Sequence, residues 1–97
     1  ALARAGLSLA DMDVIEINEA FATQVLGCAK ELGLAFDDPR LNALGGAIAI
    51  GHPLGASGAR LALTALRSLE RQQGRYALVS LCIGIGQGIA CVIERLD

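Results

Sequence analysis

The segment Tyr76–Ile83, with the sequence YALVSLCI, constrains the fold of this 97-residue chain more than any other feature. Apart from Ser80, its residues are apolar at odd and even positions alike. A strand with one face in water alternates between apolar and polar residues, whereas a strand covered on both faces does not. After a glycine-rich turn, Ile89–Arg95 is predicted to return antiparallel to it. The chain is therefore expected to form an α/β fold, a mixed sheet flanked by helices.

The other predicted elements lie between glycines. Val14–Asn18 is β-branched and short, which predicts a strand, and the apolar residues from Phe21 to Leu32 recur at helical spacing up to the stop at Gly33. Ala47–Ile50 is predicted to be a short buried strand or a turn.

A second helix is predicted from Ser57 to Gln73, ending at Gly74. The helical pattern divides its residues into two faces. The buried face is expected to carry Gly58, Ala62, Ala65, Leu66 and Leu69, and the solvated face Arg60, Arg67 and Arg71.

Composition indicates a single domain, residues 1–97, of a longer protein. The hydrophobic share is 54%, and with the 12 glycines it lies well above the average of soluble domains, about 45–50% on the scale that counts glycine. No apolar run approaches the roughly 18 residues of a membrane-spanning helix. Such a surplus predicts surface that other protein covers. The first residue is Ala1, so a fragment is expected.

Charge and cysteine content exclude several classes of protein. The net charge is −2 without a basic run, which argues against nucleic acid as a partner. Three cysteines and one histidine favour neither a disulfide framework nor a metal site. A reducing compartment is expected, by default the cytoplasm, with a mitochondrion or a peroxisome as the alternative in a eukaryote. The run GIGQG lacks the spacing of a dinucleotide-binding loop and precedes a strand rather than a helix, so NAD binding is rejected.

Three polar residues stand at the ends of predicted strands and helices, and these ends are expected at the same edge of the sheet. Asn18 ends the first strand, His52 precedes the second long helix, and Cys82 lies near the end of the next strand. Ligands bind at this edge of α/β sheets. His52 stands between a glycine and a proline, which stiffen the backbone around it. We therefore expect these three residues to share one site.

Three motifs, in this order, resemble the C-terminal part of the thiolase family. They are NEAFA (Asn18–Ala22), GGAIAIGHPLGASGAR (Gly45–Arg60) and CIGIGQG (Cys82–Gly88). The resemblance extends over nearly the whole chain and implies the C-terminal half of a layered αβαβα fold. It also implies an enzyme that makes or cleaves a carbon–carbon bond between acyl groups carried on coenzyme A. Coenzyme A is then a substrate, and no permanently bound cofactor or metal is implied.

The resemblance implies a role for each matching residue. His52 matches the histidine that activates the nucleophilic cysteine, and Cys82 matches the cysteine that moves the substrate or CoA proton. Asn18 matches the asparagine that holds a water in one oxyanion hole, and the N–H of Gly84 contributes to the other. Ala20 and Phe21 are expected along the acyl-CoA channel. The nucleophile belongs to the N-terminal half, so the isolated chain is expected to be inactive, and the parent to be a homo-oligomer.

Two departures from the family pattern keep a second interpretation open. Ile85 replaces a glycine, and a β-branched residue rarely adopts positive φ, so its backbone is expected to be ordinary or strained. Leu44 replaces an asparagine that would tie down the loop carrying His52. The alternative is a non-catalytic thiolase-like protein that binds acyl-CoA or lipid or assists assembly. A ketoacyl synthase is disfavoured because it would need a second histidine.

The remaining candidates have weaker support from the sequence. Cys28 and Cys91 are interpreted as packing residues because they lie on core-like faces. Glu19, and with less support Glu16, is considered as a residue that orients the site.

Overall fold

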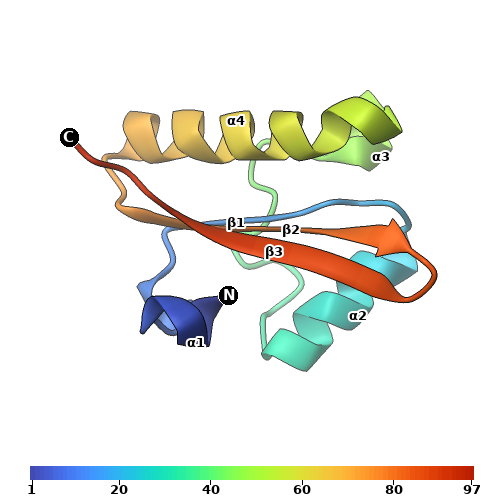
Figure 1. Cartoon of the computed structure of the whole chain (residues 1–97), viewed down its shortest axis with the longest axis horizontal. Helices are drawn as coiled ribbons and strands as arrows, with labels where there is room; N and C mark the ends of the chain where they lie inside the picture. Colours follow the sequence, from blue (N-terminus) through green and yellow to red (C-terminus); the bar gives the residue numbers. More distant parts are fainter.

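Helices cover both faces of a three-stranded sheet (Figure 1). The structure is a computed structural model that describes all 97 residues. In chain order the elements are α1 (Leu2–Ala5), the 3-10 turn η1 (Leu9–Asp11), β1 (Val14–Ile17), α2 (Ala22–Leu32), α3 (Ala47–Ile50), α4 (Leu54–Gln72), β2 (Tyr76–Gly84) and β3 (Gln87–Glu94). Helix α4 lies along one face, and α1 and α2 lie on the other (Figure 1). The predicted α/β class is confirmed.

The sheet is mixed, as the sequence predicts. Its order is β1-β2-β3, with β1 parallel to β2 and β2 antiparallel to β3. The β2–β3 ladder has an irregularity between Cys82 and Gly84, next to the hairpin. The four residues of β1 are all buried, as expected for a strand covered on both faces.

Two apolar clusters, one on each face, hold the layers together. Alternation along the strands sends Ile15 and Leu78 to the α2 side, and Val14 and Val79 to the α4 side. The first cluster is Met12, Ile15, Ile17, Val25, Ala29, Leu34 and Leu78. The second is Val14, Leu61, Ala65, Leu69, Ala77 and Val79. None of the helices combines the length and the apolar character that a bilayer crossing requires.

Residues Ala47–Ile50 form the short helix α3, so the predicted strand or turn is wrong. The apolar sequence AIAI fits a buried strand and a helical turn equally well. A contact distant in sequence decides between them: the Ile48 N–H donates to the carboxylate of Glu19. The helix ends at Gly51, whose φ of 97° turns the chain toward His52.

Helix α4 begins at Leu54, three residues before the predicted start, and its buried face is rotated from the predicted one. The buried residues are spaced by four and are Ser57, Leu61, Ala65 and Leu69. Leu66 was expected to be buried and is 38% exposed. Arg60 was expected in solvent, but its Nε and Nη2 atoms are buried, whereas Arg67 and Arg71 are exposed as predicted.

The cysteines outside the site differ in their packing. Cys28 is half-buried and packs against the first cluster, as predicted. Cys91 is exposed, so the packing role predicted for it is wrong for this chain. It lies in β3, the edge strand, which is largely uncovered.

Candidate active site

Asn18 is the first residue after β1 and holds the centre of the site. Its backbone N–H donates to the Ser80 carbonyl at 2.8 Å, which continues the parallel pairing beyond the strand. The residue is completely buried. Its Nδ2 lies 3.3 Å from Nε2 of His52. The structure therefore brings together two of the residues that the sequence analysis singled out.

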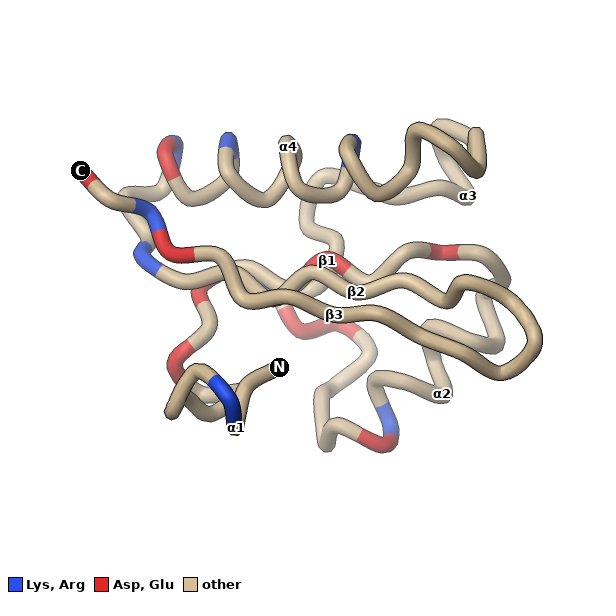
Figure 2. Tube along the Cα trace, viewed as in Figure 1, with Lys and Arg blue, Asp and Glu red and all other residues tan.

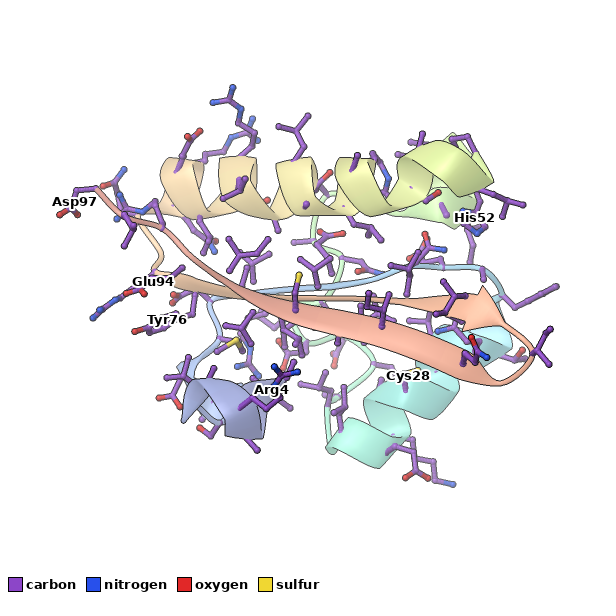
Figure 3. The ribbon with its side chains drawn as sticks, in the orientation of Figure 1. Arg4, Cys28, His52, Tyr76, Glu94 and Asp97 are labelled. Carbon is purple, nitrogen blue, oxygen red and sulfur yellow. The ribbon has the colours of Figure 1, made fainter.

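His52 lies at the junction of α3 and α4, at the same end of the sheet as the β2–β3 hairpin (Figure 3). Its second ring nitrogen, Nδ1, lies 2.5 Å from Oγ of Ser57. Ser57 is completely buried in the first turns of α4, and its hydroxyl donates to the Pro53 carbonyl at 3.2 Å. The ring is thus held from both sides by groups of this chain.

These contacts favour one tautomer of His52. A hydroxyl has one proton to donate, and that of Ser57 goes to Pro53, so the hydroxyl oxygen accepts the Nδ1–H of His52. Nε2 is then unprotonated and accepts from the Asn18 amide. An imidazole in this state is ready to take a proton at Nε2. The sequence analysis missed Ser57; its position five residues after His52, in a predicted helix start, was the available signal.

Cys82 and Gly84 lie at the end of β2. Ser80, which pairs with Asn18, precedes Cys82 by two residues, and Cys82 is half-buried. Its thiol makes no hydrogen bond to His52 or to Asn18. Gly84 is exposed and has a φ of 95°, a conformation that favours glycine. The structure thus places both residues at the expected edge of the sheet, without a hydrogen bond between the Cys82 thiol and the histidine.

Ile85, next to Gly84, adopts a φ of 54°, so of the two expected backbones the strained one is found. Its side chain is fully exposed at the tip of the hairpin. Phe21, at the start of α2, is 74% exposed, and Ala20 is half-buried. Large apolar side chains are therefore displayed around this end of the sheet.

Leu44 is exposed and stands where an asparagine was expected. The loop that carries His52 is nevertheless held by hydrogen bonds from another asparagine. Asn42, two residues earlier, performs this task. Its Oδ1 accepts the Ile17 N–H at 2.9 Å, and its Nδ2 donates to the Ile17 carbonyl at 2.9 Å and to Glu19 Oε2 at 3.1 Å. The loss predicted from Leu44 is thus made up by a neighbour that the sequence analysis missed.

Buried polar atoms without partners lie in and beneath the site. They include Oδ1 of Asn18, Oε2 of Glu16, and Nε and Nη2 of Arg60. Burial raises the pKa of Glu16 to about 7, against the lowering effect of the Arg60 charge, and Glu19 adds a smaller increase. The Oδ1 of Asn18 is thus a buried acceptor without a donor in this chain.

Comparison with known proteins identifies the family. The family described as "Thiolase, C-terminal domain" matches residues 1–95. The chain therefore belongs to the thiolase family and corresponds to its C-terminal domain. It is 65% identical over 95 residues to the beta-ketoadipyl-CoA thiolase of Acinetobacter baylyi. It is equally similar to the 3-oxoadipyl-CoA/3-oxo-5,6-dehydrosuberyl-CoA thiolase of Escherichia coli, and each match covers 98% of this chain and 24% of the relative.

Solved structures have the same fold as this chain. Human mitochondrial 3-ketoacyl-CoA thiolase matches with a TM-score of 0.93 at 51% identity, covering 99% of this chain and 24% of that one. The same enzyme in complex with CoA matches with a TM-score of 0.94 at 50% identity, covering 100% of this chain and 24% of that one. The chain thus spans about a quarter of the length of the thiolases that it matches.

Proposed function

We propose that residues 1–97 are the C-terminal catalytic domain of a larger thiolase, which cleaves 3-oxoacyl-CoA with CoA or runs the reverse Claisen condensation. The observation that supports this most is the arrangement of Asn18, His52 and Ser57, in which Nε2 of the imidazole is an unprotonated acceptor. Because two 65% identical relatives are named as thiolases of 3-oxoadipyl-CoA or beta-ketoadipyl-CoA, a 3-oxo dicarboxylic acyl-CoA is the first substrate to test.

In this mechanism, His52 Nε2 takes the proton of a cysteine that the rest of the polypeptide supplies. The resulting thiolate attacks the 3-oxo carbon, and the carbon–carbon bond breaks to give the enolate of the departing acyl-CoA. The Cys82 thiol donates a proton to the enolate carbon, and its thiolate then takes the proton of the incoming CoA. The CoA thiolate attacks the acyl-cysteine thioester, and the cysteine thiolate that leaves recovers its proton from His52. The free amide oxygen of Asn18 orients a water toward one oxyanion, and the Gly84 N–H faces the other. Ala20 and Phe21 line the acyl-CoA channel.

The rest of the same polypeptide is the proposed partner of two apolar surfaces. On the outer side of α4, Leu54, Leu63 and Leu66 are 80%, 56% and 38% exposed. On the other face of the sheet, an apolar cavity of about 670 Å3 lies between α1, α2 and β2. Burying such surface stabilises by about 25 cal/mol per Å2. The isolated chain is proposed to be inactive because the nucleophilic cysteine lies in the rest of the polypeptide. The complete enzyme is proposed to be a homo-oligomer, a dimer or a tetramer.

The test is CoA-dependent cleavage of 3-oxoadipyl-CoA by the full-length protein that contains this chain. His52→Ala is expected to lower kcat by about 10²- to 10⁴-fold, the range for loss of a general base. Cys82→Ser is expected to lower kcat similarly, whereas its matched control Cys91→Ser, at an exposed position in β3, is expected to retain wild-type kcat. Wild-type kcat in His52→Ala would refute the mechanism.

The non-catalytic alternative makes a different prediction for the same protein. The strained Ile85 beside Gly84 is the observation that favours it, because a β-branched residue in the left-handed conformation costs stability next to the proposed oxyanion donor. A full-length protein that binds acyl-CoA in calorimetry but cleaves no 3-oxoacyl-CoA would support this alternative. Turnover with CoA would exclude it.

A further inference from the structure

Glu19 forms a second connection between the end of β1 and the segment that carries His52. Its Oε1 accepts the Ile48 N–H at 3.1 Å, and its Oε2 accepts from Asn42 Nδ2 at 3.1 Å. Both partners are more than 20 residues from Glu19 in sequence, and both lie in the segment that leads to His52. One carboxylate therefore holds the loop before α3 and α3 itself.

Gly46 leaves the room that this carboxylate needs. A Cβ atom at Gly46 would overlap with the carboxylate carbon and oxygens of Glu19. Gly46 is buried, and its φ of −146° is one that any residue adopts, so close approach rather than backbone conformation explains the glycine.

The surroundings make Glu19 unusual. Residues 41–59 and 76–93, which form the loop, α3, the start of α4 and most of the hairpin, contain no Asp, Glu, Lys or Arg. In Figure 2 this end of the molecule is correspondingly almost free of charge, apart from the acidic segment that follows β1. The two hydrogen bonds that Glu19 accepts explain why a carboxylate lies at this uncharged end of the sheet. Hydrogen bonds to an ionised group are stronger than those between neutral groups.

Ile48, which donates to Glu19, is only four residues before His52 in the chain, so the position of one affects the other. Helix α3 has only four residues, and Gly51 and His52 follow it directly. Asn18, the neighbour of Glu19, contacts the ring of His52. The adjacent residues Asn18 and Glu19 thus hold the same segment at two places, one at the imidazole and one at the start of α3.

We propose that Glu19 is a positioning residue: its carboxylate, seated against Gly46, fixes α3 and thereby the position of the His52 imidazole relative to Asn18. Glu19 acts through the backbone and does not touch the reacting atoms. This inference rests on the function proposed above. A displacement of about 1 Å in a catalytic group can lower the rate by about 10²-fold.

The test uses the full-length protein, with kcat, KM and the thermal midpoint measured for Glu19→Ala, Gly46→Ala and the double variant. Each single variant is expected to lower kcat by about 10- to 100-fold, with KM within about threefold because Glu19 does not contact the substrate. The double variant is expected to match Glu19→Ala within about twofold, since the alanine at position 46 then has no carboxylate to displace. Asp37→Ala, at an exposed aspartate in the loop after α2 without a hydrogen bond, is the control and is expected to keep wild-type kcat.

Glu19→Gln keeps the test decisive if Glu19→Ala does not fold. Its amide oxygen still accepts the Ile48 N–H, but its NH2 group faces the donor Nδ2 of Asn42, so an intermediate loss of kcat is expected. Wild-type kcat in the Glu19 variants, with only the thermal midpoint lowered, would overturn the inference and leave a structural role. Multiplying effects of the two single variants would also overturn it. An inactive wild-type protein would overturn both this inference and the proposed function.

Discussion

Replacing Ser57 by alanine tests whether the tautomer of His52 is set within this chain. The change removes one oxygen atom from a completely buried side chain, so it leaves no cavity of methyl size. It takes away the acceptor of the His52 Nδ1–H. It also removes the hydroxyl's hydrogen bond to the Pro53 carbonyl at the start of α4, and it changes no other group of the site.

The expected magnitude follows from the buried groups involved. A buried N–H without an acceptor costs about 1–3 kcal/mol. The ring can avoid this by moving the proton to Nε2, because Asn18 has a buried Oδ1 without a partner that can turn to accept it. In that tautomer Nε2 can no longer take a proton. At about 1.36 kcal/mol per tenfold change in rate, kcat is expected to fall by about 5- to 150-fold.

The assay is steady-state thiolysis by the full-length protein, in parallel with Ser68→Ala. Ser68 lies on the same helix, is half-buried, and is absent from the hydrogen bonds of the site, so this control is expected to keep wild-type kcat. KM is expected to change little in either variant. A Ser57→Ala protein with kcat within twofold of wild type, when His52→Ala is inactive, would refute the assignment of the tautomer.

Further predictions concern stability. Ile85→Gly is expected to stabilise the full-length protein by about 1 kcal/mol, because the left-handed conformation costs a residue with a side chain about 1–2 kcal/mol and the flexibility of glycine offsets part of the gain; a lower thermal midpoint would contradict this. Burial in the folded state raises the pKa of Glu16 from 4.5 to about 7, so the protein takes up a proton at Glu16 when it folds between these pH values. The contribution of Glu16 to the free energy of unfolding is therefore full below pH 4.5 and is lost as the pH rises to 7. Glu16→Gln is expected to remove that loss, roughly 3 kcal/mol at about 1.36 kcal/mol per pH unit; melting curves at pH 5 and pH 8 that show the same difference between variant and wild type would contradict it. The isolated chain is expected to self-associate through the exposed leucines of α4, and a stable monomer in sedimentation at micromolar concentration would count against this.

The sequence predicted the elements whose patterns are local. The apolar run at Tyr76–Ile83 and the helical spacing from Phe21 to Leu32 each predicted an element that the structure contains, with ends that differ by one or two residues. The predicted start of helix α4 is too late because Gly55 and Gly58 are poor helix formers. The helix begins after Pro53, whose carbonyl accepts the N–H groups of Ala56 and Ser57.

Contacts between distant residues account for what the sequence did not predict. Helix α3 depends on the hydrogen bond from Ile48 to Glu19, and the role of Asn42 depends on Ile17, 25 residues away. The helical pattern predicts Arg60 in solvent, yet two nitrogens of its guanidinium are buried and its charge lowers the pKa of Glu16 in β1. Asn18, His52, Cys82 and Gly84 were selected from the motifs, and their roles remain predictions.

The two groups proposed to move protons are held to different degrees within this chain. The imidazole of His52 is bonded at both nitrogens, and its segment is fixed by Gly51, Pro53 and the carboxylate of Glu19. Cys82 lies instead at the start of an exposed hairpin whose tip has a strained backbone, and its thiol has no hydrogen bond to the histidine. Groups held by contacts inside a domain keep their geometry when a partner docks, whereas exposed segments with few contacts are the ones that adjust. Docking of the rest of the polypeptide is therefore expected to determine the position of the Cys82 thiol, and to leave His52 and Asn18 as they are here.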